Sequence, residues 1–117
     1  MKIIIAGAGQ VGFDISQQLS AEGHDIVVID SSPELVRKIG DSLDVQAIVG
    51  HASHPDSLDR AGAADIDMLM AVTHSDEVNM VTCQVAHSMF NVPLKIARIR
   101  DQSYLQPIWA DLFSRHH

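Results

Sequence analysis

Three glycines close to the N-terminus have the spacing of a turn that holds a diphosphate. Gly7, Gly9 and Gly12 follow the pattern G-x-G-x-x-G, directly after a short apolar run. In such a turn the first glycine permits a tight bend, the second lets a phosphate approach the main chain, and the third lets the next helix pack closely. The free amides of that helix then attract the anion. We therefore expect phosphate contacts from Gly7, Ala8, Gly9, Gln10 and Val11.

A carboxylate follows this turn at the spacing expected for a ribose contact. Asp30 stands 21 positions after Gly9, at the end of a second apolar run, and Ser31 is next to it. A carboxylate placed there accepts hydrogen bonds from ribose hydroxyls and repels a 2′-phosphate. The combination predicts binding of NAD(H) rather than NADP(H). The alternative, turn glycines beside a solvated aspartate, requires all three features to be in register by chance.

Two more segments are expected at the same edge, because ligands of open α/β sheets lie beyond the carboxyl ends of the strands. Gly50, His51 and Ala52 follow a third apolar run, and the small residues among them would let an adenine lie against the main chain. Thr73 and His74 follow a fourth run. An alternative stays open here, because Thr73 could simply cap the helix that begins at this point.

Arg98 and Arg100 belong to the end of a fifth apolar run, where strand alternation would place them on one face. A guanidinium at this position could pair with a phosphate. The two arginines could instead be the charged end of an edge strand, which commonly carries such residues. Both are kept as candidate ligand contacts.

Other chemistry finds little support in the sequence. His51 and His54 have the spacing of a weak metal pair, but no cysteine or carboxylate set completes it, so no metal site is expected. Cys83 is the single cysteine and is interpreted as a small core residue. No nucleophile and base have a recognisable spacing, so no catalytic residue is predicted.

The formal net charge of −7 bears on the partners. Nucleic acid and anionic lipid both need a basic face, so neither is expected as a partner. A single cysteine suits a reducing compartment, and the first residues do not resemble a cleavable signal. No apolar stretch approaches the about 20 residues of a membrane span. These features predict a soluble cytoplasmic protein with no direct membrane insertion.

Strands and helices are expected to alternate along the chain, because short apolar runs alternate with segments of helical periodicity. In the long helix predicted before the fifth strand, one apolar stripe is formed by Val78, Val81, Val85 and Met89. Strands are expected over residues 2–6, 25–30, 46–49, 66–72 and 95–99, and helices over 10–22, 33–42, 55–61, 75–90 and 104–113.

Repeated β-α units with right-handed crossovers predict an α/β fold, a doubly wound parallel sheet of the Rossmann type. Five strands are visible in the pattern. Sheets of this kind commonly have a sixth, so we expect the chain to be a fragment truncated before that strand.

Taken together, these segments resemble one known family. The run from Met1 to Gly12, Gly50-His51-Ala52-Ser53-His54-Pro55 and the stretch from Ala71 to Met80 resemble the RCK (KTN) domain of the regulatory subunits of Trk potassium-uptake systems. Two further segments do so as well, Val28-Ile29-Asp30 and Ile96-Ala97-Arg98-Ile99-Arg100. The resemblance covers essentially the whole chain, so residues 1–117 are interpreted as one RCK N-terminal, dinucleotide-binding domain.

The resemblance implies a cytoplasmic gating subunit that binds NAD+ or NADH, and in relatives ATP or ADP. Nucleotide binding would rearrange RCK domains, which associate into dimers or rings beneath a membrane-embedded potassium transporter. His74 departs from the family pattern, in which asparagine or another small polar residue is usual. The family's ligand contacts would fall on Gly7 to Val11, Asp30, Thr73, His74 and Arg98.

Two enzymatic interpretations compete with this one, because a fold does not determine a function. The chain could be the cofactor half of an NAD-dependent oxidoreductase. A methyltransferase is a more distant alternative, disfavoured by the three-glycine pattern. In the full-length protein, a second RCK-like repeat would favour regulation, whereas a substrate domain with a histidine or lysine acid/base would favour catalysis.

Overall fold

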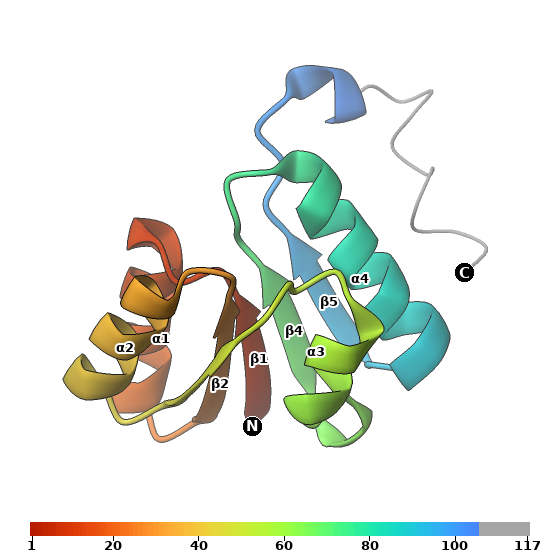
Figure 1. Cartoon of the computed structure of the whole chain (residues 1–117). Coiled ribbons are helices and arrows are strands. Elements are labelled where there is room, and N and C mark those ends of the chain that lie inside the picture. The colour runs from red at the N-terminus through yellow and green to blue at the C-terminus, as the bar shows by residue number, and fades with distance from the viewer. Residues whose placement is uncertain (106–117) are drawn as a thin grey trace.

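The computed structural model describes residues 1–105 and shows a parallel sheet of five strands with helices on both faces (Figure 1). The strand order is β3-β2-β1-β4-β5, which confirms the predicted doubly wound α/β fold. The strands are β1 (Lys2–Ala6), β2 (Asp25–Asp30), β3 (Gln46–Val49), β4 (Met68–Ala71) and β5 (Leu94–Ala97). The helices are α1 (Gln10–Ala21), α2 (Pro33–Ser42), α3 (Pro55–Arg60) and α4 (Asp76–Phe90), with short 3-10 turns η1 (Ala63–Asp65) and η2 (Gln102–Leu105).

Strand β1 forms the centre of the sheet because its side chains are apolar on both faces. Ile3 and Ile5 pack in the cluster that includes residues of α1 and α2, whereas Ile4 and Ala6 pack in the cluster that includes residues of α3 and α4. All four side chains are at most 1% exposed. Burial on both faces accounts for the unbroken apolar run in the sequence.

The order of the strands changes direction at β1. Strands β2 and β3 extend the sheet to one side of it, and β4 and β5 extend the sheet to the other. The chain leaving β1 leads to α1 on one face, and the chain leaving β4 leads to α4 on the opposite face (Figure 1). In open α/β sheets such a switch point is where ligands bind.

Helix α4 buries a different face from the predicted apolar stripe. Val81 is 42% exposed and Met89 is 58% exposed, whereas Asn79, Thr82 and Ala86 are buried. The two buried polar side chains are hydrogen-bonded, so their burial costs little, and the small Ala86 allows close packing. The predicted stripe was therefore wrong for Val81 and Met89, whereas Val85 packs against the core as the pattern indicated.

Other boundaries agree more closely with the sequence pattern. Gly23 has a φ of 88°, as a residue that ends a helix such as α1 often does. Strand β4 spans Met68–Ala71 rather than 66–72, and β5 spans Leu94–Ala97 rather than 95–99. The apolar runs in the sequence therefore extend beyond the paired residues of the sheet. The predicted helix over 104–113 lies mostly outside the described residues, and its first residues fall in η2. Among residues 1–105, no helix has the length and apolar character needed to cross a membrane.

Candidate functional site

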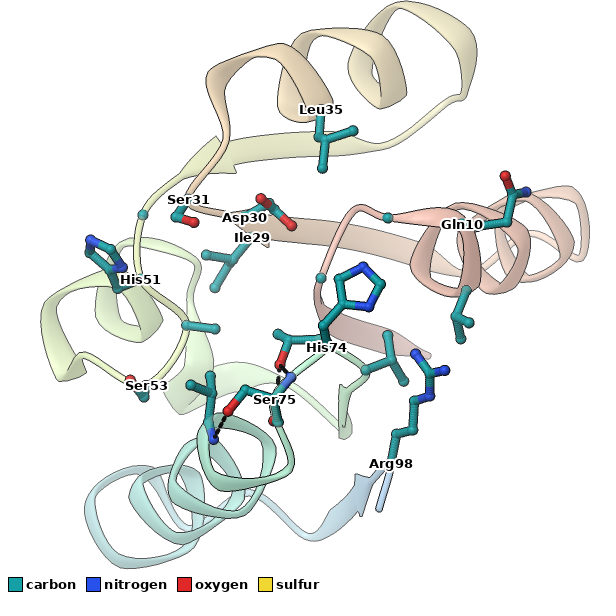
Figure 2. Close-up of a pocket in the computed structure, with 18 residues that line it drawn as sticks. Gln10, Ile29, Asp30, Ser31, Leu35, His51, Ser53, His74, Ser75 and Arg98 are labelled. Carbon is teal, nitrogen blue, oxygen red and sulfur yellow. Dashed lines mark hydrogen bonds between the residues drawn. The ribbon is translucent and has the colours of Figure 1, made fainter. Parts of the chain in front are cut away.

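A pocket of about 320 Å³ opens at the carboxyl ends of the strands (Figure 2). Of the predicted contacts, the structure brings together Gly7, Gly9, Gln10, Val11, Asp30, Ser31, Gly50, His51, Ala52, Thr73, His74 and Arg98. Two predicted contacts, Ala8 and Arg100, are not part of the lining. The lining is completed by residues that were not predicted as contacts, namely Ile29, Leu35, Ser53, Val72, Ser75 and Val78.

Close approach of the main chain shapes the glycine turn. Gly7 has a φ of 121°, and a Cβ on it would lie 3.0 Å from the carbonyl of Val72, just beyond β4. A Cβ on Gly12 would lie 2.7 Å from the carbonyl carbon of Gly7. A Cβ on Gly9 would meet only His74 Nε2, at 3.5 Å. The fold therefore needs Gly7 and Gly12, whereas the space beside Gly9 belongs to the pocket.

The N-terminus of α1 meets the pocket without a capping side chain. Ser32 caps α2 by accepting a hydrogen bond from the amide of Leu35 (3.3 Å), and Ser75 caps α4 by accepting one from the amide of Val78 (3.1 Å). Helix α1 begins after Gly9, with no side-chain cap and no acidic residue in its first turn. Its first amides have no intrahelical partner, so their partial positive charge is available to an anion.

Asp30 lies at the end of β2 and is hydrogen-bonded to the glycine turn. Its Oδ2 accepts from the amide of Ala8, and its Oδ1 accepts from the amide of Ser32, both at 2.8 Å. The amide of Ala8 is thus directed to a carboxylate, which differs from its predicted role as a phosphate donor. A carboxylate has about four acceptor positions, so Asp30 retains capacity for ribose hydroxyls in the pocket.

One buried side chain holds the opposite wall of the pocket. Asn79 is 0% exposed, and its Oδ1 accepts from the amide (2.9 Å) and the hydroxyl (2.6 Å) of Thr73. Its Nδ2 donates to the carbonyls of Thr73 (3.1 Å) and Arg98 (2.8 Å). Asn79 therefore joins the loop after β4 to the chain after β5. Sequence analysis missed this residue, although a polar side chain three positions after Asp76 on the same helix was a usable signal.

Asp76 makes a second link from α4 to the chain after β5. Its Oδ1 accepts from the amide of Arg100 and its Oδ2 from the amide of Asp101, both at 2.8 Å. Because β5 ends at Ala97, strand alternation does not extend to the arginines. Arg98 lines the pocket, whereas Arg100 lines a separate hollow beside Asp76 and Asp101. The predicted common face of the two arginines is therefore not observed.

The end of the pocket near β3 is suited to a flat, weakly polar group. Gly50, His51 and Ala52 lie there, as predicted, beside the apolar side chains of Ile29 and Leu35. Apolar side chains and exposed main chain are what an adenine ring would contact. This end therefore complements the polar end formed by the glycine turn.

The two histidines and the single cysteine that the sequence analysis considered do not form a further site among the described residues. The rings of His51 and His54 are 4.8 Å apart between centroids. Across residues 1–105, no three histidine, cysteine or acidic side chains are grouped so as to hold a metal ion. Cys83 lies on α4 and packs against the core, and burial raises the pKa of its thiol to about 11, although nearby Lys95 acts in the opposite direction. This agrees with the prediction that Cys83 is a core residue.

Comparison with known sequences identifies the relatives of the chain. The model of the TrkA-N domain matches residues 3–115. The Trk system potassium uptake protein TrkA of Azorhizobium caulinodans is 57% identical over 117 residues, covering 100% of this chain and 26% of that protein. The protein of the same name from Vibrio alginolyticus is 51% identical over 105 residues, covering 90% of this chain and 23% of that protein. The chain thus spans about a quarter of the length of these relatives.

Solved structures share the same architecture. The Kef CTD of Shewanella denitrificans in its AMP-bound form is 28% identical, with a TM-score of 0.74 over 93% of this chain and 68% of that one. The GsuK channel bound to NAD is 16% identical, with a TM-score of 0.73 over 92% of this chain and 20% of that one, which is a likeness of fold alone. With the family match extending over almost its full length, the chain belongs to the TrkA-N domain family.

Proposed function

We propose that this domain binds an adenine nucleotide in the pocket, with NAD(H) as the ligand favoured by its residues. The observation that carries the proposal is the uncapped N-terminus of α1, which meets the same pocket as the Asp30 carboxylate. The free amides of α1 attract a diphosphate, and the carboxylate of Asp30 accepts hydrogen bonds from ribose hydroxyls. The AMP in the related Kef CTD and the NAD in the GsuK channel are consistent with this ligand class.

The charges around the pocket favour NAD(H) over NADP(H). Asp30 would repel a 2′-phosphate on the ribose that it contacts. Arg98 reaches the pocket from the opposite wall, where a guanidinium can pair with the diphosphate (Figure 2). ATP and ADP offer the same ribose and phosphate groups, so they are the alternatives within this ligand class.

We further propose that binding is regulatory, in a cytoplasmic subunit that controls a membrane-embedded potassium transporter. Support comes from the relatives, which are named potassium uptake proteins and are about four times as long as this chain. A ligand regulates only if it binds two arrangements of an assembly with different affinity. A difference of about 1–3 kcal/mol suffices for a 5- to 150-fold effect.

Self-association of the full-length protein would supply the two arrangements. Helix α4 exposes Val81 and Met89, and β5 exposes Leu94 and Ile96, each by 42–58%. Exposed apolar side chains of this size are candidates for cover by a second copy. Light scattering of the full-length protein, with and without NADH, would measure the assembly and its change.

A calorimetric titration of this chain with NAD+, NADH, ATP and ADP tests the binding proposal. We expect one site per chain and a Kd in the micromolar range, about −8 kcal/mol. If no nucleotide binds more tightly than millimolar, the proposal fails. In full-length protein, Gly9→Ala would then be expected to change growth at limiting potassium without changing the amount of protein.

A further inference from the structure

His74 lies against the part of the pocket where the diphosphate is expected. It belongs to the loop between β4 and α4, its side chain is exposed, and its Nε2 would be 3.5 Å from a Cβ on Gly9. Gly9 is the residue whose missing side chain leaves space beside the first amides of α1. Figure 2 shows the imidazole pointing toward the glycine turn from the opposite wall. A ligand in the turn would therefore lie next to this ring.

The ring is not needed to hold the loop in place. Within residues 1–105, the loop is fixed by Asn79 bonding to Thr73 and by Ser75 capping α4, and none of the side-chain hydrogen bonds involves His74. Both ring nitrogens are thus available to a ligand. A neutral imidazole can donate one hydrogen bond, whereas the imidazolium donates from both nitrogens and carries a positive charge.

The charged groups around His74 are mixed. Asp30 and Arg98 share the pocket with it. On its other side, Asp76 and Glu77 from the start of α4, and Arg100 and Asp101 from the chain after β5, share the second hollow with it. A diphosphate bound at the glycine turn, beside His74, would add two negative charges on the pocket side. An added negative charge favours the imidazolium over the neutral ring.

We propose that the imidazolium form of His74, by donating to the ligand diphosphate, strengthens nucleotide binding. The inference rests on the proposed nucleotide site. Binding then takes up part of a proton, so affinity rises as the pH falls. This chain would couple nucleotide binding to pH through a side chain that interacts with the phosphates.

Calorimetric titration with NAD+ between about pH 5.5 and 8.5 tests this inference. NAD+ is the suitable probe because its diphosphate does not change charge over this range. For the unmodified chain we expect binding to tighten by about fivefold toward the acidic end, as for a hydrogen bond that gains a charge. Titration in two buffers of different ionisation enthalpy should also report net proton uptake.

Two substitutions separate the histidines of the pocket. His74→Asn should remove most of the pH dependence and the proton uptake, and its loss of affinity relative to the unmodified chain should grow toward the acidic end. His51→Asn, at the other end of the pocket, should retain the pH dependence whatever its effect on affinity.

Equal pH dependence in the unmodified chain and in His74→Asn would overturn the inference and leave the nucleotide site intact. Absence of NAD+ binding at every pH in all three proteins would instead overturn the proposed function.

Discussion

The two walls of the pocket are built by different physical means. The wall formed by β1 and α1 consists of main chain, and its shape depends on the missing side chains of Gly7, Gly9 and Gly12. The wall formed by β4, α4 and the chain after β5 depends on one buried amide, Asn79, which has four hydrogen-bonded contacts. The α1 wall is specified by residues that are close together in the sequence. The α4 wall is specified by hydrogen bonds that include one between residues 19 positions apart.

The two walls also differ in how the helix that begins in each one is capped. Ser75 satisfies the start of α4 with its own side chain, whereas the start of α1 is left without a cap. An uncapped helix end beside a pocket is a place where a ligand can supply the missing partner. The α1 wall is therefore expected to be sensitive to ligand, and the α4 wall to be stable without it.

The largest expected effect is that of Gly12→Ala on stability. The new Cβ would overlap the carbonyl group of Gly7, lying 2.7 Å from its carbon and closer still to its oxygen, so the main chain would have to shift. We expect a loss of at least about 3 kcal/mol in the free energy of unfolding, measured by urea denaturation. Gly40→Ala, inside α2, is the matched control, because its Cβ would meet the Cβ of Ala47 at an ordinary 3.6 Å, and it should change stability by at most about 1 kcal/mol. Equal losses for the two variants would show that the α1 wall is not closely packed.

Asn79→Ala should have the next largest effect. It would leave the amide of Thr73 and the carbonyl of Arg98 without partners, at a cost of about 2–3 kcal/mol in stability. NAD+ affinity should fall as well, because both residues line the pocket. Ser88→Ala on the exposed side of the same helix should stay within about 0.5 kcal/mol. If Asn79→Ala is as stable as Ser88→Ala, the buried amide does not hold this wall.

Gly9→Ala should separate binding from folding. Its Cβ would meet only His74 Nε2, at an ordinary contact distance, so we expect a stability loss of at most about 1 kcal/mol. The same Cβ would occupy space beside the first amides of α1, and NAD+ affinity should fall by about tenfold or more. Calorimetry measures the NAD+ affinity, and urea denaturation of the same sample measures the free energy of unfolding. Unchanged affinity would mean that the diphosphate lies elsewhere.

The smallest expected effect concerns the thiol of Cys83, on the inner side of α4. Burial raises the pKa of Cys83 to about 11 from 9.0, so iodoacetamide should react slowly with the folded chain. As the pH rises above 9.0, an unfolded thiol ionises while the folded one keeps its proton, so stability should fall over that range. Alkylation as fast as that of the urea-unfolded chain would contradict a closely packed α4.

Local patterns predicted the fold and one wall of the site. The apolar run of β1, the glycine spacing and Asp30 all act through neighbours or through the regular geometry of a βαβ unit, so their consequences could be derived in advance. The boundaries of β1 and β3 agree with the structure for the same reason.

The second wall could not be derived in this way. The hydrogen bonds from Asn79 to the carbonyl of Arg98 and from the amide of Arg100 to Asp76 join residues 19 and 24 positions apart. Periodicity carries no information about such pairs, and it misplaced the inner face of α4 because polar side chains are buried there. The bond from Ala8 to Asp30 escaped prediction as well, since both residues had been assigned to the ligand rather than to each other.

The most direct test of the nucleotide site compares NADH with NADPH in the unmodified chain and in Asp30→Asn. Asn keeps one acceptor for the turn but removes the negative charge beside the ribose. We predict that the unmodified chain binds NADH at least about tenfold more tightly than NADPH, and that the substitution narrows this ratio. Equal affinity for the two nucleotides in the unmodified chain, or a ratio that Asp30→Asn leaves unchanged, would contradict the placement of the ribose at Asp30.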